Sequence, residues 1–313
     1  MDIRKAAIIG CGMVGATTAF ALMESGIFTD ITLIDVDRDR AVGEAMDLSH
    51  CLPYVKPVDI RAGDYPDLSD CGIIIITAGV PQKEGETRLD CIHKNVDVFK
   101  SIVPKITAYN RDGILLVVSN PVDIMSYVTY RLSGFDSRRV FGSGTVLDSA
   151  RLRFLLGRRL NVAPSSVHAF IIGEHGDSEL AAWSGATVGG VELSKYCTHR
   201  GYTRHGENRL RIEKLVKNSA YDIIERKRAT YYGIAVATRR ICECIVRDER
   251  AILPVSTLID GHYGLGGLYI SVPATLGTNG VCDVLDIDLS PAELSALQAS
   301  AQTLKDAIAE IGF

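Results

Sequence analysis

The stretch that decides the fold is IIGCGMVG, residues 8–15, in which Gly10, Gly12 and Gly15 have the spacing G-x-G-x-x-G. In a strand–turn–helix context the first glycine permits a tight turn. The second lets the backbone approach a pyrophosphate, and the third lets helix and strand pack closely. The helix that follows offers free N–H groups and a partial positive charge to the phosphates. The alternative is a glycine-rich turn that binds nothing.

A carboxylate at the end of the next apolar segment strengthens the first interpretation. Asp35 lies in LIDVD, about twenty residues beyond the glycines, where an acid accepts hydrogen bonds from both ribose hydroxyls and repels a 2′-phosphate. The pattern therefore predicts NAD as the cofactor in preference to NADP. Arg40, five residues beyond Asp35, would weaken this repulsion.

The segments outward from this motif alternate between strand-like and helix-like patterns. The expected strands cover residues 5–10, 31–36, 58–63, 72–79 and 114–120, and the expected helices cover 13–25, 38–49 and 90–109. Short apolar runs between helices indicate a parallel sheet covered on both faces. We therefore expect an α/β fold with a Rossmann-type doubly wound parallel sheet in residues 1–143.

The second part of the chain has a different order of helix-like and strand-like patterns. This order predicts an α+β catalytic domain in residues 144–313. Its expected elements are helices at 146–160, 207–226 and 233–247, antiparallel strands at 251–259 and 267–276, and a helix that starts after Ser290. Ser290, Pro291 and Glu293 form a strong helix-start signal. Because no linker separates the two parts, we expect them to share a tight interface.

Composition limits the classes of partner. The chain has 313 residues, a net charge of -4 and 47% hydrophobic residues, which is the profile of a globular protein and gives no basic domain for nucleic acid. No apolar run reaches the ~18 residues of a membrane span. The eight cysteines show no CxxC pair and the histidines are dispersed, which favours reduced thiols in the cytoplasm and no metal site.

Polar residues follow the expected strands where a doubly wound sheet binds its ligands. Gln82 and Arg88 lie in a glycine- and proline-containing loop, and Asn120 follows the next strand. Asp148 and Arg151 are three residues apart on one helix, so they share a face. The helix is apolar around them, which argues against a solvated surface pair and predicts His175 and an anionic ligand as further partners.

These motifs resemble the L-2-hydroxy-acid dehydrogenases of the lactate/malate type, and most of all the lactate branch. The similarity runs nearly end to end through GCGMVG, LIDVD, GEAMDL, TAGVPQKEGETRLD, SNPVDIMSY, GSGTVLDSARLR, IIGEHGDSE, ATYYGIA, STLIDGHYG and YISVPATLG. It implies a dinucleotide-dependent oxidoreductase in which His175 is the acid/base and Asp148 fixes and charges its ring. Arg151 would clamp the substrate carboxylate, and Arg88 would polarise the carbonyl.

The resemblance assigns the remaining site residues. Asn120 would bind near the reacting oxygen and Thr230 would line the pocket. The cofactor contacts implied are Gly10, Gly12, Val14, Gly15, Asp35, Arg40, Tyr65, Gly79, Val80, Ser101, Asn120 and Ser143.

Residue 82 is where this family discriminates between substrates. The malate enzymes have arginine there, facing a second carboxylate, whereas this chain has the neutral Gln82. We therefore expect pyruvate and L-lactate as the substrate pair. The alternatives are a malate or branched 2-hydroxy acid dehydrogenase and, in a different class, a dinucleotide-binding protein without catalysis.

Two further cations match a regulatory site. Bacterial members activated by fructose 1,6-bisphosphate have an arginine and a histidine where this chain has Arg153 and His168, at a subunit interface. The resemblance thus implies this effector and a homotetramer, in which symmetry brings the cations together until a bisphosphate relieves their repulsion. The alternative is a solvated basic helix face and a strand histidine.

Overall fold

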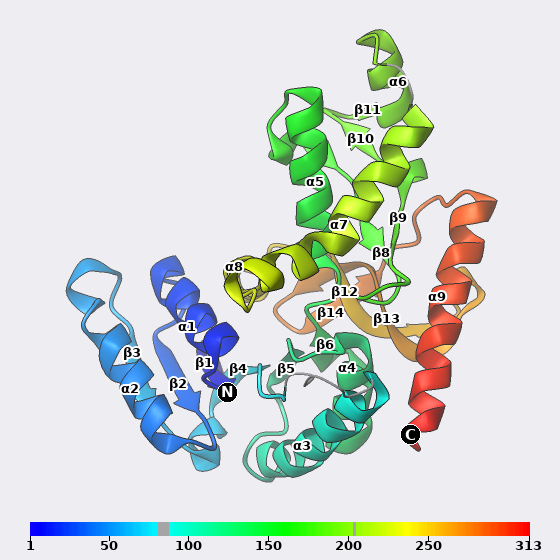
Figure 1. Cartoon of the computed structure of the whole chain (residues 1–313). Coiled ribbons are helices and arrows are strands. Elements are labelled where there is room, and N and C mark those ends of the chain that lie inside the picture. Colours follow the sequence, from blue (N-terminus) through cyan, green and yellow to red (C-terminus); the bar gives the residue numbers. More distant parts are fainter. Residues whose placement is uncertain (81–87, 203–204) are drawn as a thin grey trace.

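The computed structural model describes residues 1–80, 88–202 and 205–313, with the side chains of residues 88, 205 and 206 left out. Figure 1 shows a sheet flanked by helices, with a smaller lobe above it. The helices are α1 Met13–Ser25, α2 Arg38–Ser49, α3 Arg88–Tyr109, α4 Val122–Ser133, α5 Val146–Leu160, α6 Leu193–His199, α7 His205–Lys227, α8 Tyr232–Val246 and α9 Pro291–Glu310.

The strands alternate with the helices up to β6, as the sequence predicts, except that only a short 3₁₀ turn separates β3 from β4. They are β1 Asp2–Ile9, β2 Asp30–Ile34, β3 Asp59–Ala62, β4 Cys71–Ile76, β5 Ile114–Val117, β6 Val140–Gly142, β7 Val167–His168, β8 Ile171–Ile172, β9 Leu180–Ala181, β10 Thr187–Val188, β11 Val191–Glu192, β12 Ala251–Asp260, β13 Gly266–Gly277 and β14 Gly280–Val284.

The large sheet has the order β14-β13-β12-β6-β5-β4-β1-β2-β3. The strands from β6 to β3 are parallel in the doubly wound order, so the predicted fold class is confirmed. Strands β12, β13 and β14 are antiparallel and extend the same sheet, because Ser256 of β12 pairs with Gly142 of β6. The antiparallel strands predicted in the second part therefore continue the sheet of the first.

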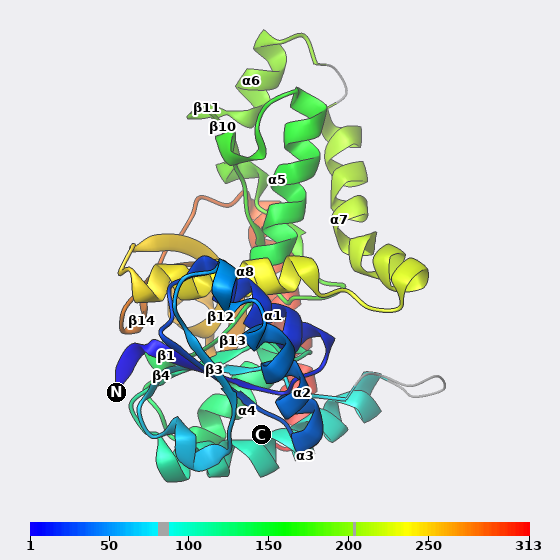
Figure 2. The ribbon, with the colours of Figure 1, turned by 90° about the vertical axis from the view of Figure 1, so that its left-hand side faces the viewer.

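Alternate residues of the central strands face two apolar layers. Ala7 and Ile9 of β1 pack toward α3, α4 and α9, whereas Ala6 and Ile8 pack toward α1, α2 and α8. Figure 2 shows α8 lying across α1, so a helix from the second part of the chain covers the first. Both layers thus combine residues from the two parts of the chain, which fits the tight interface expected from the missing linker.

The smaller lobe has a core of its own, built from α5, α6, α7 and short strands. The segment VHAFII, residues 167–172, is divided here between two sheets. β7 pairs with β10, whereas β8 pairs with β9. The end of β8 leads directly into the loop that contains His175.

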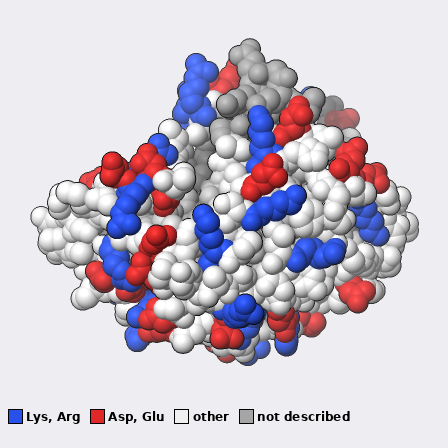
Figure 3. Space-filling model, turned by 90° about the horizontal axis from the view of Figure 1, so that it is seen from below, with Lys and Arg blue, Asp and Glu red and all other residues white. Residues whose placement is uncertain are grey.

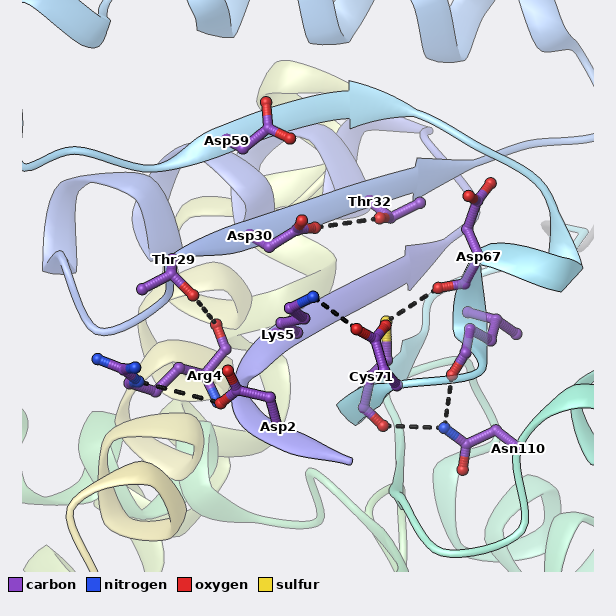
Figure 4. Close-up of polar contacts among 12 residues, drawn as sticks. Asp2, Arg4, Lys5, Thr29, Asp30, Thr32, Asp59, Asp67, Cys71 and Asn110 are labelled. Atoms are coloured by element: carbon purple, nitrogen blue, oxygen red, sulfur yellow. Dashed lines mark hydrogen bonds and ion pairs between the residues drawn. The ribbon is translucent and has the colours of Figure 1, made fainter.

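The amino halves of the parallel strands are joined by polar contacts (Figure 4). Lys5 forms an ion pair with Asp70 at 2.5 Å, and the Asn110 amide donates to the carbonyls of Leu68 and Cys71 at 2.6 and 2.9 Å. These groups lie away from the carboxyl edge that carries the glycine motif, so their role is structural. On the face seen in Figure 3, acidic and basic side chains are interspersed.

Candidate active site

The glycine loop lies between β1 and α1, and two of its glycines are required by close packing. Gly10 has φ +101°, and a Cβ there would lie 2.6 Å from the backbone nitrogen of Ala78. A Cβ on Gly15 would lie 1.8 Å from the carbonyl oxygen of Gly10. At Gly12, by contrast, a Cβ would meet no atom within 4 Å. The space beside Gly12 is therefore open to a ligand.

The first turn of α1 faces this open space with its N–H groups uncapped. No side chain caps the helix at Gly12, and the first turn contains no acidic residue. The positive end of the helix is thus available to an anion, as a pyrophosphate group requires.

A cleft of about 680 Å³ lies along the carboxyl edge of the parallel strands. It is lined by predicted cofactor residues Gly10, Gly12, Asp35, Arg40, Tyr65, Gly79, Val80 and Ser101. Sequence reasoning missed other members of this lining, among them Thr77, Lys94, Asp97 and Lys105. The spacing of Asp97, Ser101 and Lys105 at four-residue intervals on one helix face is the signal that could have found two of them.

The Asp35 carboxylate is held in place at the rim of this cleft. Its Oδ2 accepts a hydrogen bond from the Cys11 N–H at 2.5 Å, and its Oδ1 accepts one from the Asp37 N–H at 2.9 Å. A carboxylate has about four acceptor positions, so it can still accept from two hydroxyls. Nearby, the Lys105 ammonium lies 5.3 Å from the centre of the Tyr65 ring, which fixes that wall of the cleft.

Four of the predicted cofactor residues are outside the lining of the cleft. Val14 and Gly15 are in the first turn of α1, where Gly15 is buried against the glycine loop. Ser143 follows β6, and its N–H donates to the Val117 carbonyl. Asn120 follows β5 and precedes a cis peptide bond to Pro121.

The acid/base residues predicted from the sequence lie in direct contact. The His175 Nδ1 is 2.6 Å from Asp148 Oδ2, and an Arg151 guanidinium nitrogen donates to Asp148 Oδ1, also at 2.6 Å. Asp148 is buried, with 2% of its side chain exposed, while His175 and Arg151 are partly exposed. One buried carboxylate thus holds both an imidazole and a guanidinium that reach solvent.

The charge of Asp148 determines the protonation of His175. Burial alone lowers the pKa of His175, but the charge of Asp148 and its hydrogen bond outweigh burial and raise the pKa to about 9. Burial opposes ionisation of Asp148 as well, yet His175 and Arg151 hold the pKa of that carboxyl below its usual value. At neutral pH the ring is an imidazolium and can donate a proton.

This raised pKa also links the folded state to pH. Because the folded pKa of His175 lies above its ordinary value of 6.5, the pair stabilises the fold fully below that pH. The stabilisation is lost as pH rises toward and through about 9.

A second buried carboxylate, which sequence reasoning missed, positions the catalytic loop. Asp123, 1% exposed in the first turn of α4, accepts from the His175 backbone N–H at 2.7 Å and from the Ser271 hydroxyl at 3.0 Å. Burial raises the pKa of Asp123, and these donors oppose the rise. The residue joins α4, β13 and the loop of His175, a link between distant segments that no local pattern reveals.

Hydrogen bonds also connect the cofactor cleft to this loop. The Val80 N–H donates to the Asn95 side-chain oxygen at 2.8 Å, and the Asn95 amide donates to the Asn120 carbonyl at 3.2 Å. Asp123 follows Asn120 by three residues and binds the backbone of His175. His175 and Asp148 are called the acid/base couple below. The cofactor cleft and this couple are therefore connected by one set of hydrogen bonds.

Glu179 is a further acidic residue close to the couple. An oxygen of Glu179, an oxygen of Asp148 and a ring nitrogen of His175 lie within 4.8 Å of one another. The sequence, in which the histidines are dispersed, does not predict this grouping of two acids and an imidazole. Its members come from α5 and from the loop after β8, and only the fold brings them together.

Other predicted residues are placed less completely. Gln82 lies outside the described residues, and Arg88 begins α3 but its side chain is not described. Thr230 is half-buried in the segment between α7 and α8. Arg153 is half-buried on α5, where burial lowers its pKa, and His168 is exposed on β7.

Two family models match the chain almost throughout. Residues 4–142 match the lactate/malate dehydrogenase NAD-binding domain, and residues 145–312 match the lactate/malate dehydrogenase alpha/beta C-terminal domain. The chain belongs to the lactate/malate dehydrogenase family. The glycine loop, Asp35 and the cleft lie in the first of these regions, and the contacts among His175, Asp148 and Arg151 lie in the second.

Relatives in this lactate/malate dehydrogenase family match over nearly their full length. The chain is 50% identical over 306 residues to an L-lactate dehydrogenase of Acetivibrio thermocellus, covering 98% of this chain and 96% of that protein. It is 49% identical over 307 residues to an L-lactate dehydrogenase of Thermoanaerobacterium saccharolyticum, covering 98% and 99%.

Solved structures agree with this placement in the lactate/malate dehydrogenase family. A lactate dehydrogenase from a Medee basin deep-sea metagenome library superposes with a TM-score of 0.97 at 41% identity, covering 100% of both chains. The ligand-bound minor L-lactate dehydrogenase of Enterococcus mundtii gives a TM-score of 0.95 at 41% identity, covering 98% of both chains.

Proposed function

We propose that this chain is an NAD-dependent L-lactate dehydrogenase that interconverts pyruvate and L-lactate. The observation that carries the proposal is the buried Asp148 holding both His175 and Arg151 at 2.6 Å. This arrangement offers a proton donor beside a guanidinium, which are the two groups that a 2-oxo acid needs for its carbonyl and its carboxylate. The close relatives named as L-lactate dehydrogenases support the same substrate.

In this proposal each residue of the site has a separate role. His175 as imidazolium protonates the keto oxygen of pyruvate and, when neutral, removes the hydroxyl proton of lactate. Asp148 holds the ring and stabilises its charged form, while Arg151 binds the carboxylate in a bidentate manner. Asn120 binds near the reacting oxygen and Thr230 lines the pocket. Arg88, the first residue of α3, polarises the carbonyl.

The cofactor we propose is NAD, which supplies or accepts the hydride when bound. The open space at Gly12, the uncapped start of α1 and the cleft that contains Asp35 fit a dinucleotide. The Asp35 carboxylate would bind the ribose hydroxyls and disfavour a 2′-phosphate. Tyr65, Gly79, Val80 and Ser101 would complete the contacts along the cleft.

Substrate choice is the sharpest test of this function. We expect kcat/KM for pyruvate to exceed that for oxaloacetate, because Gln82 leaves a second carboxylate uncompensated. Gln82→Arg should shift the ratio of the two kcat/KM values toward oxaloacetate by at least about tenfold. The measurement is NADH oxidation with a panel of 2-oxo acids, and the same panel with NADPH tests the cofactor.

The panel also decides between the alternatives. A wild-type preference for oxaloacetate would identify a malate dehydrogenase, and a preference for branched 2-oxo acids would identify an enzyme of bulkier substrates. No oxidation of NADH with any 2-oxo acid would favour the non-catalytic dinucleotide-binding alternative. Either of the first two results would contradict pyruvate as the substrate but leave the chemistry intact.

We also propose that fructose 1,6-bisphosphate activates a homotetramer through Arg153 and His168. Arg153 lies two residues beyond Arg151 on α5. An effector bound to Arg153 would therefore favour one position of the helix that carries Arg151, the residue that binds the substrate carboxylate. Exposed apolar side chains such as Leu210, 70% exposed, support burial in an assembly. The bisphosphate should lower the KM for pyruvate and raise the sedimenting mass, and Arg153→Gln should abolish both effects.

We retain the division into a cofactor domain of residues 1–143 and a catalytic domain of residues 144–313 as a proposal. The two family matches meet between residues 142 and 145, which supports it. None of the eight cysteines forms a disulfide bond in the described part of the chain, which supports the reducing cytoplasm as the location. In the described part of the chain, no helix is long and apolar enough to cross a membrane.

A further inference from the structure

Glu179 is a buried acid with no role in the reaction as proposed above. It immediately precedes β9, and 4% of the residue is exposed. Among residues 1–80, 88–202 and 205–313 its carboxyl group has no hydrogen-bond or ion-pair partner. Its oxygens are not among the fully enclosed polar atoms without a partner, but a carboxyl group with so little exposure is costly to ionise, so the role of its charge needs an explanation.

Its position relative to the acid/base couple suggests that explanation. A Glu179 oxygen lies within 4.8 Å of both a His175 ring nitrogen and an Asp148 oxygen. Both oxygens of Asp148 are already engaged, one with His175 and the other with Arg151. Glu179 is therefore a second acid beside the imidazole, and it is not tied to any other group.

The charges around Glu179 come from three elements. Its own loop contributes His175, α5 contributes Asp148 and Arg151, and α7 contributes Lys217. The Lys217 ammonium donates to the carbonyl of Asp177 at 3.1 Å, so it is engaged without forming an ion pair with Glu179. Asp123 of α4, which accepts from the His175 backbone N–H, adds negative charge near the imidazole as well.

Because of these surrounding charges, Glu179 loses its proton in a pH range close to that of His175. Burial and then the charge of Asp148 raise the pKa of Glu179 to about 8, against the opposing effect of the three cations. Glu179 is thus largely neutral at pH 7 and ionises as the pH approaches the range in which His175 loses its proton. Two groups at this distance titrate as a coupled pair.

We propose that Glu179 is a positioning residue that acts through His175. When Glu179 ionises, its negative charge keeps the imidazole of His175 protonated to a higher pH. Each Glu179 that loses its proton adds a negative charge beside the ring, which favours the charged imidazole. Pyruvate reduction would then continue to a higher pH than Asp148 alone would support. This inference rests on the proposed function, since it assigns a role within the same site.

The test is the pH dependence of kcat/KM for pyruvate, measured from about pH 6 to about pH 10 for wild type, Glu179→Gln and Glu179→Asp. In Glu179→Gln the midpoint of the falling limb should move to lower pH by about one pH unit, because the variant cannot ionise. Glu179→Asp keeps an ionisable carboxyl group, so its midpoint should lie between those of Glu179→Gln and wild type. At the acid end, where Glu179 is neutral, wild type and Glu179→Gln should have similar rates.

Glu174→Gln is the matched control. Glu174 is buried in the same loop, but its Oε2 accepts from the Ser178 hydroxyl at 2.5 Å. This variant should change stability without moving the midpoint. A midpoint in Glu179→Gln that is unchanged or moved to higher pH would overturn the inference.

A second measurement does not depend on turnover. Diethyl pyrocarbonate modifies neutral imidazole, and His175 has 26% of its side chain exposed. Mass spectrometry of the His175 peptide across pH should give a modification midpoint that moves downward in Glu179→Gln. If wild type reduces no 2-oxo acid, the proposed function fails while this midpoint still tests Glu179. If wild type is active and neither midpoint moves, only the role of Glu179 fails.

Discussion

His175→Asn should lower kcat for pyruvate reduction by about 10³-fold, the largest effect expected from any single substitution in this chain. The asparagine amide can still donate to Asp148 from near the former Nδ1, so the buried carboxylate keeps a partner. It cannot supply a proton to the keto oxygen. Stopped-flow measurement of NADH oxidation would give the rate, and NADH binding followed by fluorescence should stay close to wild type.

The control for this substitution is His50→Asn. His50 is exposed at the end of α2, away from the carboxyl edge of the sheet, so its replacement should leave kcat unchanged. If His175→Asn retained more than about a tenth of wild-type activity, His175 would not be the acid of the reaction.

Asp123→Ala should lower the free energy of unfolding by about 3 kcal/mol, since it leaves the His175 N–H and the Ser271 hydroxyl without their acceptor. The loop of His175 should also lose its fixed position, so kcat should fall together with stability. Urea unfolding at a fixed protein concentration measures the first effect, because any assembly makes stability depend on concentration.

Two comparisons separate the effect of Asp123 from that of a lost charge. Ser271→Ala removes one of the two donors and should cost about 1 kcal/mol. Asp59→Ala removes an exposed acid that pairs with Arg61 at 3.2 Å and should cost at most about 0.5 kcal/mol. Equal losses for Asp123→Ala and Asp59→Ala would contradict the linking role of Asp123.

Local signals predicted much of the fold. Helices α1, α2 and α5 have the bounds expected from the sequence, and α9 begins with the predicted capping box of Ser290 and Glu293. Such signals act within a few residues, because a cap, a proline or a positive φ determines the backbone beside it. The glycine motif belongs to the same class, and its crowded turn at Gly10 follows from spacing alone.

Pairings between distant segments could not be predicted in the same way. Nothing in the sequence near Ser256 indicates that β12 adds to β6, and nothing near Asp123 indicates that it binds the backbone of His175. The same holds for Asn95 and Glu179, whose positions depend on how the helices and loops pack. The resemblance supplied the residues that contact ligands, but not the buried residues that hold them in place.

The continuous sheet has a consequence for motion. Because β12 pairs with β6 and both core layers contain residues from the two parts of the chain, a clamshell opening would break ladder hydrogen bonds and expose buried apolar surface. Within residues 1–80, 88–202 and 205–313, the cofactor cleft and the pair of His175 and Asp148 are carried by one continuous sheet and its shared core layers. In the proposed reaction, the distance over which hydride travels would therefore be set by this shared sheet and core.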